Sequence, residues 1–205
     1  MPETLVDRFA EVLAETERLI RAVADGEWTA ATPCAGWTVH DLVNHLVAGN
    51  RLFVEVLAGN PPPLEEIRRR AVADQLGDAP PIAFRESADA LLAAFRVPGA
   101  LDRSVRTPIG TVPAAAALHL RITEALVHSW DLARATGRAV DFPDDLVEQE
   151  LAFSRARLGD VEPGRAPFGP AQPVPDDAPA LDRLAGCLGR AVTAWPAAPR
   201  GVREG

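Results

Sequence analysis

The chain has 205 residues, of which 47% are hydrophobic and 24% are charged. This mixture is typical of a folded globular protein and excludes a chain that is disordered throughout. The formal net charge is −8, and all 21 basic residues are arginine. A diffuse acidic charge argues against nucleic-acid binding, because affinity for a phosphate backbone requires clustered cations.

The sequence carries no sign of a membrane or secretory protein. No run of about 18 apolar residues predicts a membrane span, and the N-terminal residues lack the apolar region of a signal peptide. Cys34 and Cys187 are far apart, as expected for reduced thiols in the cytoplasm. Cys34 precedes a predicted helix, where its thiol is either activated or simply buried in a tight turn.

Apolar residues at helical spacing predict most of the fold. The first helix is expected over 3–25. The second begins at the N-cap Thr38, with Asp41 three residues later in a capping-box arrangement, and it ends before Gly59. Four further helices are expected at 82–96, 113–137, 143–158 and 179–195.

Three other stretches lack a helical pattern. Residues 61–80 form a polar and less regular connection, and 100–112 are expected to be a loop or short hairpin. Residues 161–179 contain six prolines, and the 26 residues that follow are too few for an independent core. The sequence therefore predicts one all-α domain over 1–205, made of a core at 3–160, a Pro-rich strap at 161–179 and a docking helix at 180–195.

A narrow polar stripe runs along the helix predicted at 113–137. It contains Arg121, Glu124, His128 and Asp131, and apolar residues flank it on both sides. An ordinary solvated helix face is wider than this. The stripe therefore predicts polar groups that point into an interior cleft, where buried charges require a partner or a metal ion.

Two of these residues have the spacing of metal ligands. Glu124 and His128 are four residues apart, which brings their Cβ atoms to about 5–6 Å on one helix face. An ion with bonds of about 2.0–2.2 Å can bridge such a pair. His45, at the edge of the apolar face of the second helix, would complete a set of two histidines and one carboxylate with open coordination positions. Asp131 could then orient a ligating imidazole through a hydrogen bond to the ring nitrogen that does not bind the ion.

Ion pairing explains the same stripe without a metal. Its charged residues can pair at spacings of three and four, and each such pair contributes only about 0.2–0.5 kcal/mol to helix stability. His45 alone is compatible with a histidine at the edge of the core. His119 lies outside the stripe, where a structural role is expected.

Two blocks of sequence resemble a known family. They are Thr32-Pro33-Cys34-Ala35-Gly36-Trp37-Thr38-Val39 with the following Leu42-Val43-Asn44-His45-Leu46, and Thr123 to Ala133. Both are similar to the DinB-like metal-binding proteins of actinobacteria, which are relatives of the N-terminal domain of mycothiol-dependent maleylpyruvate isomerase. A third block, at 166–179, resembles the tail of the shorter single-domain members.

The resemblance implies a DinB/YfiT-like four-helix bundle with additional C-terminal helices. It also implies a divalent metal held by His45, Glu124 and His128, and use of a low-molecular-weight thiol such as mycothiol. Arg121 could hold an anionic cofactor or substrate, or could neutralise Glu124. The isomerase has a C-terminal domain that this chain is too short to carry, so the isomerase reaction itself is not implied.

We therefore expect a metal-binding protein, with zinc as the first choice of ion because histidine and carboxylate ligands suit it. The expected activity is a thiol-dependent transfer or isomerisation of small electrophilic molecules. The alternatives are a non-enzymatic, metal-stabilised binding or interaction module, and a metal-free structural bundle. The sequence leaves open whether the chain forms a homodimer.

Overall fold

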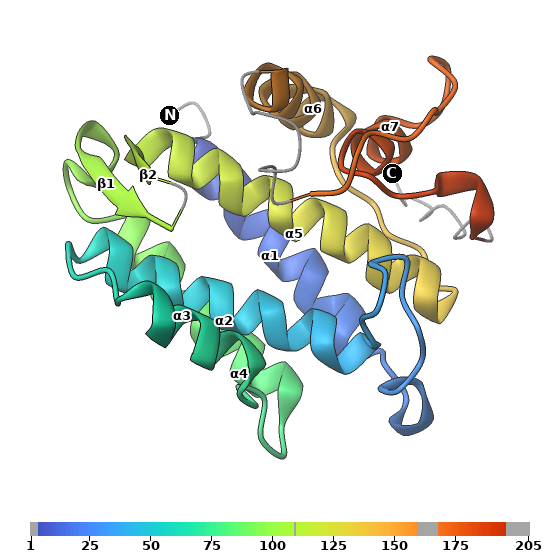
Figure 1. Cartoon of the computed structure of the whole chain (residues 1–205), viewed down its shortest axis with the longest axis horizontal. Helices are drawn as coiled ribbons and strands as arrows, with labels where there is room; N and C mark the ends of the chain where they lie inside the picture. Colours follow the sequence, from blue (N-terminus) through green and yellow to red (C-terminus); the bar gives the residue numbers. More distant parts are fainter. Residues whose placement is uncertain (1–3, 109, 160–167, 196–205) are drawn as a thin grey trace.

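A computed structural model of the chain describes residues 4–108, 110–159 and 168–195. Its centre is a bundle of four helices, α1 (Leu5–Arg21), α2 (Val39–Leu57), α4 (Pro80–Phe95) and α5 (Ala114–Thr136). They pack in the order α1, α4, α2, α5 and back to α1 (Figure 1). Large apolar side chains such as Phe9, Leu46, Phe84 and Leu126 fill the space between them. The predicted helical bundle is therefore confirmed.

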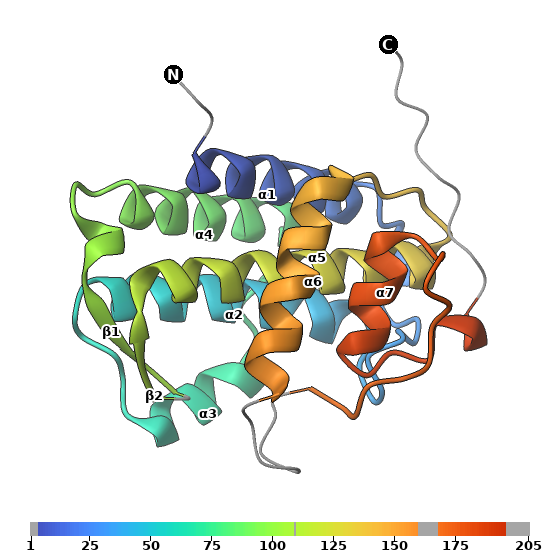
Figure 2. The ribbon, with the colours of Figure 1, turned by 90° about the horizontal axis from the view of Figure 1, so that it is seen from above.

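Two further helices bury the outer side of α5. Helices α6 (Asp144–Gly159) and α7 (Ala180–Cys187) pack against each other and against α5. Figure 1 shows them on the opposite side of α5 from α2, and Figure 2 shows both crossing it. Because α5 has neighbours on both sides, most of its residues are buried, including six polar ones: Arg121, Thr123, His128, Ser129, Asp131 and Arg134. Within the described residues, no helix is both long and apolar enough to span a membrane.

The chain departs from a purely helical fold in one hairpin. Strands β1 (Ser104–Thr107) and β2 (Gly110–Pro113) pair antiparallel, with Ser104 opposite Pro113. The sequence left a loop or a hairpin open for 100–112, and the structure contains the hairpin. Its buried residues, Val105 and Val112, join the core at one end of the bundle.

The predicted start of α2 is confirmed. The Thr38 hydroxyl accepts a hydrogen bond from the Asp41 backbone N–H at 3.2 Å, and the Asp41 carboxylate accepts one from the Thr38 backbone N–H at 2.9 Å. These two contacts satisfy backbone donors that a helix N-terminus otherwise leaves without partners. The capping box thus fixes the first turn of the helix that carries His45.

The prediction of an irregular connection at 61–80 is wrong, because this stretch contains helix α3 (Leu64–Val72). None of the residues of α3 is buried, and its apolar face is limited to Leu64, Ile67 and Ala71, which are too few to distinguish a helix from a loop by periodicity. Ion pairs hold the helix, between Arg70 and both Glu55 and Glu66. Helix propensity and charge pairing are the sources of this helix.

The docking helix expected at 180–195 is shorter than predicted. Helix α7 ends at Cys187, and a single 3₁₀ turn, Val192–Ala194, follows. Gly189 has a φ of +88°, a left-handed conformation that stops an α-helix. Of the strap expected at 161–179, residues 168–179 have no regular helix or strand, and 161–167 lie outside the described residues.

We expect Thr38→Ala to lower the free energy of unfolding by about 1 kcal/mol, because it removes the side-chain cap of α2. Urea denaturation followed by circular dichroism measures the change. Thr29→Ala, at an exposed position in the turn before α2, is the matched control and should differ little from wild type.

The cap also predicts a pH dependence. Hydrogen bonds from Thr38 hold the pKa of Asp41 below its ordinary value. The stability that ionised Asp41 contributes is fully present above the pKa that this residue has in the unfolded chain. It is lost as pH falls through the lower pKa that Asp41 has in the folded protein. The stability difference between wild type and Thr38→Ala should therefore shrink in acid, and a difference that grows as pH falls would contradict the assignment.

Candidate metal centre

The three predicted ligands meet between α2 and α5. One ligand atom each from His45, Glu124 and His128 lies within 4.8 Å of the other two. The Glu124 Oε2 atom is 3.0 Å from His45 Nε2 and 3.3 Å from His128 Nε2. The structure therefore brings together, from two helices, the set of two histidines and one carboxylate that the sequence predicts.

His128 lies between two carboxylates. Its Nδ1 atom is 3.0 Å from Asp131 Oδ2, while its Nε2 atom faces Glu124. Only 3% of His128 is exposed, and Asp131 is fully buried. A neutral imidazole has one N–H and can donate to only one of these partners. The side facing Glu124 therefore suits either a second proton or a cation.

The electrostatics of the cluster favour an ionised Glu124. Burial by itself raises the pKa of Glu124, but the hydrogen bonds with His128 and His45 hold it well below its ordinary value. Burial alone would lower the pKa of His128, yet its bonds with Asp131 and Glu124 outweigh burial and raise that pKa. Burial holds the pKa of His45 below its ordinary value despite the neighbouring carboxylate.

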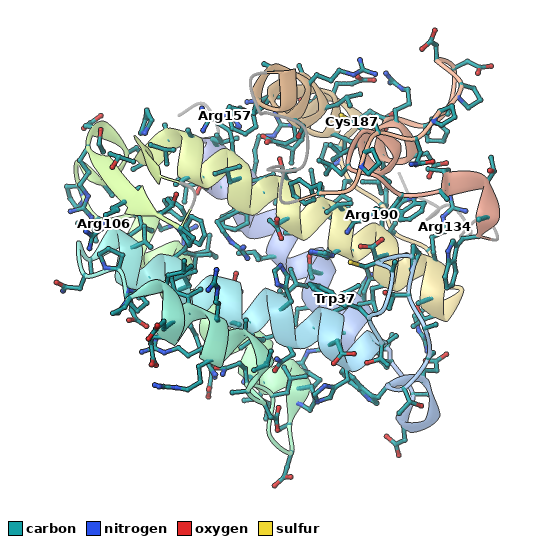
Figure 3. All side chains as sticks on the ribbon, in the orientation of Figure 1. Trp37, Arg106, Arg134, Arg157, Cys187 and Arg190 are labelled. Carbon is teal, nitrogen blue, oxygen red and sulfur yellow. The ribbon has the colours of Figure 1, made fainter. Side chains whose placement is uncertain are left out.

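Asp131 has a buried partner that the sequence did not reveal. Arg190 donates from Nε to Asp131 Oδ1 at 3.2 Å and from its NH2 group to Oδ2 at 2.8 Å. The two residues are 59 positions apart, and no spacing pattern links them. Gly189 permits this approach, because a Cβ there would lie 2.8 Å from the backbone of Gly169. Figure 3 shows Arg190 between α5 and the C-terminal segment.

Trp37 covers the imidazoles of the cluster. Its ring centroid is 5.7 Å from that of His128, with nearly parallel planes, and 4.8 Å from that of His45. The indole forms an aromatic wall beside the candidate ligands, positioned by the turn in which the Trp37 carbonyl accepts hydrogen bonds from Thr32.

Cys34, in the same turn, does not have the properties of an activated thiol. It is half-buried, and burial raises the pKa of its thiol. An activated cysteine requires the opposite shift. The structure thus favours the alternative of a small residue packed in a tight turn.

Arg121 lies beside the cluster but makes no ion pair with Glu124. It is 3% exposed, and it donates a hydrogen bond to Asn50 Oδ1 at 2.9 Å. Its guanidinium carbon is 5.2 Å from the centre of the Phe53 ring. Its Nε–H has no hydrogen-bond partner among the described residues. A Cβ on residue 49 would lie 2.7 Å from the guanidinium, so Gly49 makes room for it.

His119 lies apart from the cluster, as expected. Its Nδ1 atom is 2.7 Å from the buried carboxylate of Glu150, and its ring stacks on Phe153 at 4.7 Å. These contacts join α5 to α6. They fit the structural role that the sequence predicted for this residue.

Comparison with known proteins gives one family. Residues 9–133 match the family model described as the mycothiol maleylpyruvate isomerase N-terminal domain. The chain is also 35% identical over 192 residues to two proteins of Mycobacterium tuberculosis, from strains CDC 1551 / Oshkosh and H37Rv, each named only as uncharacterized. Both matches cover 91% of this chain and 93% of the relative.

Two solved structures share the fold. The crystal structure of a mycothiol-dependent maleylpyruvate isomerase has a TM-score of 0.59 at 22% identity, and that of a histidine-to-alanine mutant has 0.56 at 23%. Each match covers 72% of this chain and 66% of the isomerase, so this chain spans slightly less than two thirds of that enzyme. The family match at 9–133 includes all three candidate ligands and ends before Arg190.

We expect Arg190→Met to lower the free energy of unfolding by about 3 kcal/mol or more, because it leaves the buried carboxylate of Asp131 without its cation. Urea denaturation measures the loss. Arg69→Met is the control, since Arg69 forms only an exposed pair with Glu66, worth at most about 1 kcal/mol. Equal losses in the two variants would contradict a stabilising role for the buried pair.

Proposed function

The chain belongs to the family of the mycothiol maleylpyruvate isomerase N-terminal domain, and on that premise we propose that it is a metal-dependent enzyme of thiol chemistry. It would catalyse thiol-dependent transfer or isomerisation of small electrophilic molecules. The observation that carries this proposal is the convergence of His45, Glu124 and His128. The same three residues are the proposed metal ligands.

The donor set fits a divalent ion, with zinc as the first choice. Ligand atoms of a tetrahedral zinc site with bonds of about 2.0–2.2 Å lie about 3.3–3.6 Å apart. The Glu124 oxygen is 3.0 and 3.3 Å from the two imidazole nitrogens, and all three ligand atoms lie within 4.8 Å of one another, so side-chain movements would be needed to reach this spacing. Asp131 supports the fit, because a carboxylate behind a ligating histidine fixes its orientation and tautomer.

The surrounding residues have defined parts in the proposed chemistry. A divalent ion at this site would supply a Lewis acid that lowers the pKa of a thiol bound to it, so that the thiol would lose its proton to water near neutral pH. Asp131, held by Arg190, would accept a hydrogen bond from the Nδ1–H of His128 and so leave Nε2, the nitrogen that faces Glu124, available to hold the ion. Trp37 excludes water from the face of the imidazoles that it covers.

Arg121 is the proposed contact for an anionic group of the thiol cofactor or the substrate. Its charge is buried beside the cluster, and its Nε–H is without a partner among the described residues. A buried donor in this state gains more from an incoming acceptor than a solvated one does. Asn50 and the Phe53 ring hold the guanidinium in place for that contact.

Mycothiol is the proposed thiol because the isomerase with the same fold is mycothiol-dependent. Isomerisation of maleylpyruvate itself is not part of the proposal, since the match reaches only 66% of that enzyme. The substrate is therefore defined by its chemistry, as a small molecule with an electrophilic carbon that a thiolate can attack.

We expect untagged wild-type protein incubated with zinc to retain about one ion per chain, and His128→Ala to retain less than about a tenth of that. Elemental mass spectrometry after exhaustive dialysis measures the content. His40→Ala, which removes a more exposed histidine of α2, is the control and should bind as wild type does. Stoichiometric zinc in a folded His128→Ala variant would overturn the ligand assignment.

We expect the zinc-loaded protein to accelerate the reaction of mycothiol with an electrophile such as 1-chloro-2,4-dinitrobenzene. Glu124→Gln should reduce this acceleration at least about a hundredfold, because it removes the anionic ligand. Glu65→Gln, at an exposed position of α3, is the control. A protein that binds zinc but accelerates no thiol reaction would be a metal-stabilised binding module instead.

A further inference from the structure

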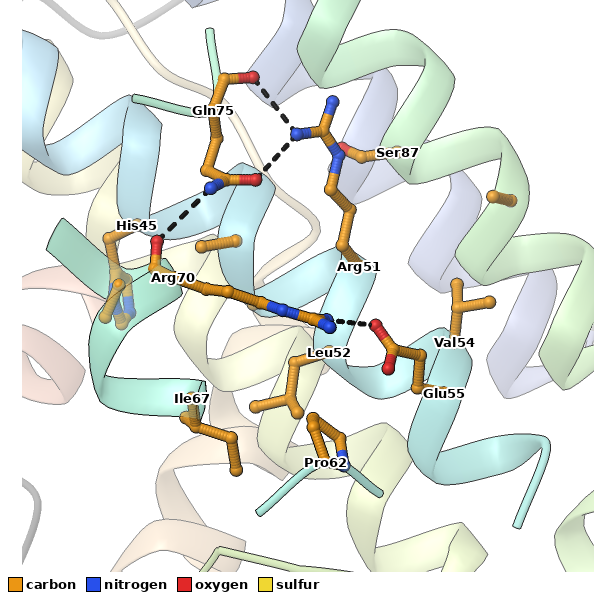
Figure 4. Close-up of a pocket in the computed structure, with 14 residues that line it drawn as sticks. His45, Arg51, Leu52, Val54, Glu55, Pro62, Ile67, Arg70, Gln75 and Ser87 are labelled. Carbon is orange, nitrogen blue, oxygen red and sulfur yellow. Dashed lines mark hydrogen bonds and ion pairs between the residues drawn. The ribbon is translucent and has the colours of Figure 1, made fainter. Parts of the chain in front are cut away.

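A cavity of about 550 Å³ lies next to the candidate metal centre, between α2, α3 and α4. His45 forms part of its wall, so the cavity and the three-ligand cluster share one side chain. Figure 4 shows this pocket, with His45 at one end and Glu55 and Pro62 toward the other. Its volume falls within the range of about 300–1,000 Å³ that is usual for small-molecule sites.

The cavity exists because α3 is tethered to α2 by polar contacts. Helix α3 buries none of its own residues. The Asn44 side chain holds the segment after α3, donating to the Ala73 carbonyl at 3.0 Å and accepting from the Gln75 backbone N–H at 2.7 Å. Arg70 ties α3 to Glu55 on α2. The helix thus stands away from α2 and leaves a hollow beside His45.

The lining combines apolar walls with one arginine that has no carboxylate partner among the described residues. Leu52, Ile67 and several alanines supply most of the walls. The charge of Arg70 is balanced by Glu55 and Glu66. Arg51 differs, because it is exposed at the rim of the cavity and its contacts among the described residues are the backbone and side-chain oxygens of Gln75, at 3.2 and 2.7 Å, and no carboxylate. Gln75 therefore positions a guanidinium at the pocket without neutralising it.

We propose that this cavity binds a small amphipathic carboxylate, with its apolar body against Leu52 and Ile67 and its carboxylate on Arg51. The opposite end of the ligand then lies at His45, beside the three-ligand cluster. The inference rests on the proposed function and deepens it, since it names the class of electrophile that the cluster would receive. Arg51 is the specificity-determining residue for the charge of that ligand.

The test compares a carboxylate probe with its neutral amide. We expect zinc-loaded wild-type protein to bind 4-phenylbutyrate or 6-phenylhexanoate at least about tenfold more tightly than the corresponding amide in isothermal titration calorimetry. Arg51→Gln should weaken carboxylate binding about tenfold and leave amide binding unchanged. Arg68→Gln, an exposed arginine of α3 that does not line the cavity, is the matched control.

A second variant tests the cavity itself. Ala48→Phe places a large ring in the pocket and should abolish binding of both the acid and the amide. Equal binding of acid and amide by wild type, no effect of Arg51→Gln, or no binding of either acid would each overturn the proposal.

Different experimental results would overturn the proposed function and the proposed ligand of the cavity. His128→Ala removes a candidate metal ligand but does not line the cavity, so it should lose zinc while binding the carboxylates within about twofold of wild type. Zinc binding without carboxylate binding would overturn the pocket alone. Carboxylate binding by a wild-type protein that takes up no zinc would instead overturn the metal site.

Discussion

The structure depends on how the bundle compensates the charged stripe that its central helix buries. Helix α5 buries Arg121, His128 and Asp131 and places the partly exposed Glu124 beside them, and a buried ionised group without a partner costs several kcal/mol. Each neighbouring element therefore presents a matching group. From α2 come His45 for Glu124 and Asn50 for Arg121. These pairings fix the position of α2 along α5 more sharply than apolar contacts alone would.

Helix α7 and the residues that follow it also present partners to the buried polar residues of α5. Arg190 pairs with Asp131, and Asp182 accepts hydrogen bonds from Trp130 at 2.6 Å and from Arg134 at 2.7 Å. Trp130 and Asp131 lie within the family match at 9–133, whereas Arg134, Asp182 and Arg190 lie beyond it. Residues beyond the family domain thus support the orientation of His128, which links the C-terminal segment to the chemistry proposed for the cluster.

Local patterns in the sequence predict much of this arrangement. The capping box at Thr38 and the narrow stripe on α5 depend on residues three to four positions apart, so their geometry follows from a helix alone. The set of His45, Glu124 and His128 adds only one contact between helices. The sequence could predict this contact because His45 lies on the edge of an apolar helix face, and such a face packs against the rest of the core.

The features that the sequence did not reveal depend on distant or purely polar contacts. Helix α3 buries none of its residues, and its three apolar residues at helical spacing are too few to indicate a helix by periodicity. Arg190 contacts Asp131, which is 59 positions away in the sequence. The contact depends on Gly189, whose close approach to the backbone of Gly169 is visible only in the folded structure. Trp37 precedes α2 in a position typical of a hydrophobic staple, and only the packed structure shows that it stacks on His128.

The central claim is that the carboxylate of Glu124 and its two neighbouring imidazoles form a zinc site. Zinc K-edge X-ray absorption of the untagged, zinc-loaded protein tests it directly. The account predicts a first shell of nitrogen and oxygen at about 2.0–2.1 Å with the multiple-scattering pattern of two imidazoles. A sulfur neighbour at about 2.3 Å, or a shell with no imidazole scattering, would contradict it.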